Sequence, residues 1–123
     1  MRICQPHWDK IRAKIKELGL DHLGAKSGEQ AHADMVAQAN GEETAFDPLM
    51  TVNHMITSKA LEHGGLYLMG VKEDGSHYCP ICEALAHKPD DVDLDKAEQY
   101  WIEGPTNAVL KMAQEGGHVP KTQ

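Results

Sequence analysis

The chain has 123 residues, with 19 acidic residues against 12 lysines and arginines, and a formal net charge of −7. This length fits one domain spanning residues 1–123. The acidic balance argues against broad binding to nucleic acid or to a membrane surface, because both need a basic face. Hydrophobic residues make up 41% of the chain but aromatic residues only 5%, so the core must be largely aliphatic. A core this small gains stability from a bound metal ion.

The first expected element is a helix that starts at Pro6, a residue favoured in the first turn, and stops at Gly19. Its apolar residues recur at helical spacing and are Trp8, Ile11, Ile15 and Leu18. A second helix is expected over residues 27–40, with Ser27 as its N-cap. The apolar face of this second helix is weak, because alanines provide most of it.

A third helix follows, with Asp47 as its cap, Pro48 in its first turn and Gly64-Gly65 at its end. Five apolar residues form one wide stripe along it: Leu49, Val52, Met55, Ile56 and Ala60. A stripe of this width indicates burial on more than one side. We therefore expect this helix to be the central buried helix of the domain.

A β-hairpin is expected after the third helix. Leu66-Tyr67-Leu68-Met69 is a short apolar run typical of a strand, Asp74-Gly75 is a strong turn motif, and His77-Tyr78 can pair back. Such a hairpin would deliver Cys79 and Cys82 at its end. The predicted fold class is thus mainly α with one short β-hairpin, in a small zinc-stabilised single domain with an element like a treble clef or zinc knuckle.

Three further helices are expected before the C-terminus. A short one begins at Cys82 and runs to His87, after which residues 88–93 form an acidic loop. The next runs from Leu94 to about Ile102, and the last from Pro105 to Glu115, because proline rarely continues a helix. Residues 117–123 are expected to form a flexible tail.

Two ligand pairs stand out for their spacing: Cys4-Gln-Pro-His7 and Cys79-Pro-Ile-Cys82. Together they use all three cysteines of the chain. Three thiolates and one imidazole make a closed tetrahedral set, which structural zinc prefers. The sequence therefore predicts a structural Zn²⁺ held by Cys4, His7, Cys79 and Cys82. The fourth ligand stays open at this stage, because a different histidine could replace His7: His77, His54 or His87.

Other readings of the cysteines are less favoured. A redox Cys-x-x-Cys pair usually lies at a strand-to-helix step in a βαβ unit, and this chain lacks that pattern. A catalytic zinc site keeps one position open for water, which a filled Cys₃His set does not. The pairs therefore favour a structural role for the metal and a protein that is not an enzyme.

Two alternative functions rest on other residues. A metal-dependent nuclease or hydrolase could use histidines outside the two pairs: His22, His32, His54 and His63. A DNA-binding zinc module could use the basic face of the first helix, made by Arg2, Lys10, Arg12, Lys14 and Lys16. The net charge disfavours the second alternative. Tyr100-Trp101-Ile102 is an apolar cluster that fits either core or an interface.

Localisation is expected to be cytoplasmic. The opening residues lack the apolar stretch of a signal peptide, and no run approaches the length that crosses a bilayer. An odd number of cysteines fits poorly with a secreted disulfide framework. Short helices around a small core can also leave an apolar face uncovered, so a homodimer is one expected state.

Four motifs together resemble a group of small uncharacterised bacteriophage and prophage proteins. They are Cys4-Gln-Pro-His7-Trp8, Phe46-Asp47-Pro48-Leu49-Met50, Cys79-Pro-Ile-Cys82-Glu83 and Trp101-Ile102. The resemblance covers almost the whole chain but brings no established activity. It implies a phage accessory protein in the bacterial cytoplasm that binds a host or phage protein.

Overall fold

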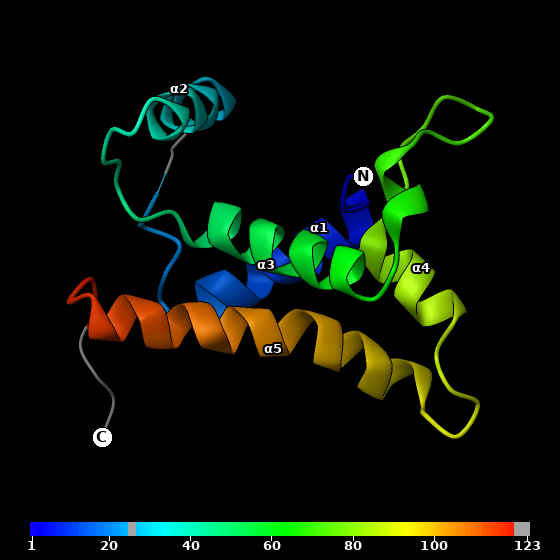
Figure 1. Cartoon of the computed structure of the whole chain (residues 1–123). Coiled ribbons are helices and arrows are strands. Elements are labelled where there is room, and N and C mark those ends of the chain that lie inside the picture. The colour runs from blue at the N-terminus through cyan, green and yellow to red at the C-terminus, as the bar shows by residue number, and fades with distance from the viewer. Residues whose placement is uncertain (25–26, 120–123) are drawn as a thin grey trace.

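Two helices, α3 (Pro48–Glu62) and α5 (Leu94–Glu115), lie side by side and run in opposite directions (Figure 1). The structure is a computed structural model and describes residues 1–24 and 27–119. The helices α1 (Gln5–Glu17) and α4 (Pro80–Ala86) each pack against both α3 and α5. These four helices enclose the core and bring the N-terminus close to the segment that begins α4 (Figure 1).

The core is aliphatic, as the composition predicts. Ile11 and Ile15 of α1 face Val52 and Ile56 of α3, and each pair follows the four-residue spacing that places side chains on one side of a helix. The most buried stripe of α3 also includes Ala60, which confirms this helix as central. Full burial of one such aliphatic side chain contributes about 1.5–3 kcal/mol.

The second helix, α2 (Gly28–Ala39), forms where the sequence predicts it. The Ser27 hydroxyl accepts a hydrogen bond of 3.1 Å from the backbone N–H of Gln30, as an N-cap does. None of its residues is buried, and α2 stands apart from the other helices (Figure 1). Met35 and Val36 are therefore exposed, which agrees with the weak apolar face of this segment.

The predicted β-hairpin is wrong. Leu66–Met69 is a 3₁₀ helix, η1, and an isolated antiparallel bridge from Val71 to His77 is all the β-structure among the described residues. The turn itself is correct, because Asp74 accepts from the backbone N–H of Ser76 at 2.9 Å. An isolated two-stranded hairpin is marginal in water, and these exposed residues have no sheet to pack on. A four-residue apolar run also does not distinguish strand from helix by periodicity.

The predicted break at Pro105 is also wrong, because α5 continues through it as one helix. Pro105 lacks an N–H and removes one hydrogen bond of the helix. The neighbouring Thr106 is fully buried, and its hydroxyl donates to the carbonyl of Ile102 at 2.9 Å. Pro105, Thr106 and Ile102 are all buried. Packing on the core therefore outweighs the low helix propensity of proline.

Helix α4 begins earlier than predicted, at Pro80, with Cys79 as its N-cap. Of the predicted tail 117–123, residues 120–123 lie outside the described residues. His118 stacks on Phe46 with ring centres 4.8 Å apart. None of the described helices has the length and apolar character needed to cross a membrane.

Candidate metal centre

The two ligand pairs occupy equivalent positions on two helices. Cys4 is the N-cap of α1, and His7 is the third residue of that helix. Cys79 is the N-cap of α4, and Cys82 is the third residue of that helix. The N-cap and third positions lie over the same first turn, and a proline stands between them in both pairs. This explains why two intervening residues place both ligands of a pair on one side.

Backbone contacts bring the two pairs together. The N–H of Arg2 donates to the carbonyl of Tyr78 at 2.8 Å, so the residues before the first pair lie along the residues before the second. Ile3 is buried in the core next to Cys79 in the chain of packed residues. The N-terminal segment is therefore fixed beside α4.

The four donor atoms lie within 4.8 Å of one another. Cys4 Sγ is 3.1 Å from His7 Nδ1 and 3.6 Å from Cys82 Sγ. His7 Nδ1 is 3.5 Å from Cys82 Sγ and 3.7 Å from Cys79 Sγ. Bond lengths of about 2.3 Å to sulfur and about 2.0 Å to nitrogen give tetrahedral edges of about 3.5–3.8 Å. The cluster therefore has the size that one tetrahedral metal ion requires.

Burial differs across the cluster. Cys79 and His7 are buried, with 5% and 8% of their surface exposed, whereas Cys4 is half-buried and Cys82 is exposed. Partial burial and hydrogen bonds to Cys4 and Cys79 raise the pKa of the Cys82 thiol to about 12. A metal ion must therefore displace a firmly held proton from Cys82. Cys82 also marks the side from which an ion can enter.

A carboxylate lies behind the imidazole. Glu98 of α5 is 3.5 Å from His7 Nε2, on the opposite side of the ring from the sulfur atoms. Lys10 of α1 pairs with the same carboxylate. The Lys10 ammonium, and then His7, hold the pKa of Glu98 below its ordinary value, so the carboxylate is ionised at neutral pH. A carboxylate in this place fixes the ring and leaves Nδ1 to bind a metal.

The other histidines that the sequence offers as ligands lie elsewhere. His77, His54 and His87 are all exposed, and none belongs to the cluster. His87 instead faces Glu83 at 3.9 Å. The histidines of the hydrolase alternative are also exposed and outside it: His22, His32, His54 and His63. Among the described residues, the structure therefore brings together the two cysteine-containing pairs.

A separate hollow of about 760 Å³ lies on the other side of α4, between η1, α4 and the first half of α5. Its walls include Leu68, Ala84, Ala97 and Trp101. Sequence reasoning named Trp101 as core or interface but did not find the hollow, and it missed Glu98. The sequence gives no sign of either, because both depend on how α5 packs against α1 and α4.

Comparisons with protein-family models, with curated proteins and with solved structures find no match to this chain. The phage resemblance of the four motifs therefore stays an expectation. The donor atoms themselves indicate what the site can do. Three sulfur ligands and one imidazole fill a tetrahedral shell and leave no position for water or substrate. These residues could hold a metal ion in a structural role.

Proposed function

We propose that this chain is a non-enzymatic binding protein whose fold is held by one structural Zn²⁺ on Cys4, His7, Cys79 and Cys82. The observation that carries the proposal is the convergence of four donor atoms within 4.8 Å from segments far apart in the sequence. Thiolate-rich tetrahedral sets favour Zn²⁺ over Mg²⁺, Ca²⁺ or Mn²⁺, which prefer oxygen ligands. The ion would join the starts of α1 and α4.

Function then lies on the surface of the protein. The closed ligand set offers no open position for chemistry, and the apolar hollow lies apart from it. Apolar surface that solvent reaches and polar residues surround is typical of protein interaction sites. With the phage resemblance, this supports an accessory protein that acts in the bacterial cytoplasm by binding a host or phage protein.

The two alternative functions gain no specific support. A nuclease or hydrolase needs a second group of ligands or an open position, and the candidate histidines do not converge within the described part of the chain. The basic face of α1 is partly neutralised, because Lys10 pairs with Glu98 and Lys14 lies 3.8 Å from Glu103. Strong nucleic-acid binding needs cations that are available to phosphates.

Zinc removal tests the proposal. Protein purified with its metal is treated with a chelator under reducing conditions, and its helical circular dichroism and thermal unfolding midpoint are recorded. We expect the helical content and the midpoint to fall, and one equivalent of Zn²⁺ to restore both. Stripped protein that keeps the same spectrum and midpoint would contradict a structural zinc. Turnover of a nucleic-acid or peptide substrate across a metal panel would contradict the non-enzymatic role.

A further inference from the structure

The hollow beside α4 has an apolar floor. Leu68 and Ala97 are buried in it, and Trp101 is half-buried at its side. Its volume of about 760 Å³ is enough for several side chains of a partner. The hollow is therefore a place where apolar groups of another molecule can leave water.

Exposed apolar side chains extend this surface beyond the hollow. Tyr67 lines the hollow and is 52% exposed, and its neighbours Leu66 and Met69 in η1 are 70% and 64% exposed. The Tyr67 ring meets Tyr78 edge to face, with centres 5.6 Å apart. A small molecule inside the hollow would leave Leu66 and Met69 in water. A protein segment that crosses η1 into the hollow would cover them, and exposed Tyr, Met and Trp are typical anchors of protein interfaces.

Cations surround this surface although the chain as a whole is acidic. Lys88 and Lys96 line the hollow, against Glu83 as the carboxylate among its described lining residues. The Glu83 carboxylate already faces His87. Within the described residues no ion pair involves Lys88 or Lys96. The edge of the hollow therefore carries positive charge that a partner can neutralise.

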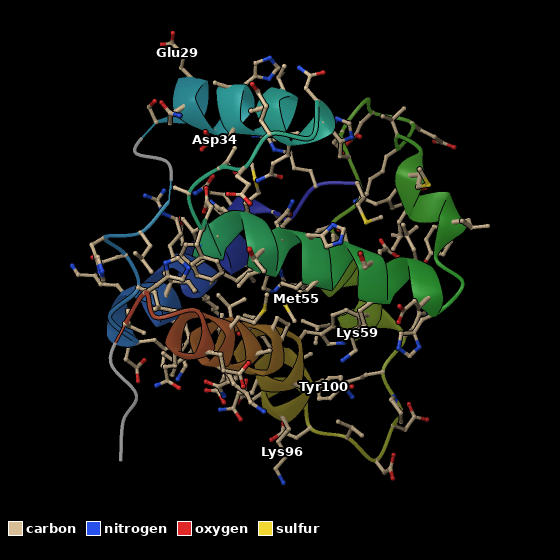
Figure 2. All side chains as sticks on the ribbon, turned by 60° about the vertical axis from the view of Figure 1, so that its left-hand side comes forward. Glu29, Asp34, Met55, Lys59, Lys96 and Tyr100 are labelled. Carbon is tan, nitrogen blue, oxygen red and sulfur yellow. The ribbon has the colours of Figure 1, made fainter. Side chains whose placement is uncertain are left out.

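A further lysine lies between the aromatic rings of this region. Lys59 Nζ is 3.6 Å from the centre of the Tyr100 ring and 5.1 Å from that of Trp101. Figure 2 shows Lys59 on α3 and Tyr100 on α5 pointing toward one another, with Lys96 at the start of α5. The rings hold the ammonium beside the hollow without cancelling its charge, as a carboxylate would.

We propose that this hollow binds a segment of a partner protein that inserts an apolar side chain and carries acidic residues beside it. The apolar anchor would pack against Trp101 and Ala84, and its acidic neighbours would meet Lys88 and Lys96. Charge complementarity and the continuity of the hollow with η1 support this partner. The inference rests on the proposed binding function and names the chemistry of the partner.

Selection from a library of random linear peptides on the immobilised zinc-loaded protein tests the proposal. We expect the enriched peptides to share an aromatic or aliphatic anchor flanked by Asp or Glu. A synthetic peptide of the enriched sequence, labelled with fluorescein, then gives a Kd by fluorescence anisotropy. The Kd should rise with salt, because exposed charge pairs are screened. An enriched set without acidic residues, or no enrichment, would overturn the proposal.

Two substitutions locate the peptide. Ala84→Arg fills the hollow and should weaken binding by about tenfold or more, whereas Ala33→Arg, the same change on α2, should leave the Kd unchanged. Lys96→Glu should also weaken binding, whereas Lys111→Glu at the other end of α5 should not. Lys96 is exposed, so its variant keeps the test valid if Ala84→Arg does not fold.

Other occupants of the hollow have distinct outcomes. Sedimentation that shows a dimer dissociated by Ala84→Arg would assign the hollow to a second copy and overturn the proposal. Decanoate that binds as tightly as the peptide would assign it to a small amphipathic acid, with the same consequence. Peptides that bind equally to wild type, Ala84→Arg and Lys96→Glu would keep a binding function but place it elsewhere.

The zinc content of each sample separates this inference from the proposed function. Zinc-free protein that still selects acidic peptides would overturn the structural zinc and keep the partner chemistry. Zinc-loaded, folded protein that selects no peptide would overturn the partner chemistry and keep the structural zinc.

Discussion

Cys4 Sγ lies 3.6 Å from Cys82 Sγ, although 78 positions separate the two residues. The contact joins the cap of α1 to the first turn of α4, and the two helices pack against the same faces of α3 and α5. A metal ion bound here therefore stabilises a long-range closure of the chain. Closing such a loop costs conformational entropy, which metal binding offsets.

His7→Ala should abolish stoichiometric zinc binding. The substitution removes one of four ligands and leaves a gap behind the sulfur atoms. The loss of affinity should exceed the roughly 10–100-fold that is typical of a change in the outer shell. Competition against a chromogenic chelator measures it. His54→Ala is the matched control, because His54 is exposed and outside the cluster. Equal zinc affinity in the two variants would contradict His7 as a ligand.

Glu98→Gln should weaken zinc binding by about 10–100-fold while the fold is retained. The amide keeps the shape of the side chain but loses the charge that supports the His7 ring. Glu103→Gln provides the comparison, because Glu103 lies on the same helix and approaches Lys14 instead of a ligand. The same chelator competition measures both variants. If Glu98→Gln matches Glu103→Gln, the carboxylate has no role in positioning the imidazole.

Zinc affinity should fall as the pH falls. The pKa of the Cys82 thiol is raised from 9.0 to about 12, so this group is protonated across the neutral range before metal binds. Zinc binds the thiolate, so binding releases protons and is opposed by acid. Because zinc binds the folded chain, the stability of the zinc-loaded protein should also decrease toward acid pH. Proton uptake by an indicator dye in weak buffer measures the release. Affinity independent of pH would contradict thiolate ligation.

Thr106→Val should destabilise the protein by about 0.5–1.5 kcal/mol. The change keeps the shape of the side chain but removes the hydroxyl that donates to the buried carbonyl of Ile102 next to Pro105. Thr57→Val is the control, because Thr57 makes the same kind of bond to Asn53 in a region that solvent reaches. Urea unfolding gives both free energies. Equal losses would mean that the Thr106 bond does not support α5 around its proline.

The helices and the ligand pairs could be predicted from sequence because each depends on local spacing. Ser27, Asp47 and the glycines at helix ends mark boundaries through their own backbone preferences. The convergence of Cys4 with Cys82 could be expected only from the chemistry of a shared metal. Pairs that use all three cysteines indicate one site, even where nothing local connects them.

The errors arise where tertiary packing decides. Leu66–Met69 is apolar enough for a strand, but burial of Leu68 alone suits a single 3₁₀ turn. Pro105 should end a helix in isolation, yet its buried neighbours keep α5 continuous. Glu98 and the hollow beside α4 depend on how helices distant in sequence pack together. No spacing rule in a single sequence reports such a contact.

Zinc stoichiometry by elemental analysis, on protein purified without added metal and on Cys82→Ser prepared in parallel, is the most direct measurement. We predict one zinc per chain in the unaltered protein. In Cys82→Ser we predict loss of zinc together with a lower helical circular dichroism signal and unfolding midpoint. Protein without zinc, or zinc that leaves while the fold and its midpoint stay unchanged, would contradict a structural metal centre at the junction of α1 and α4.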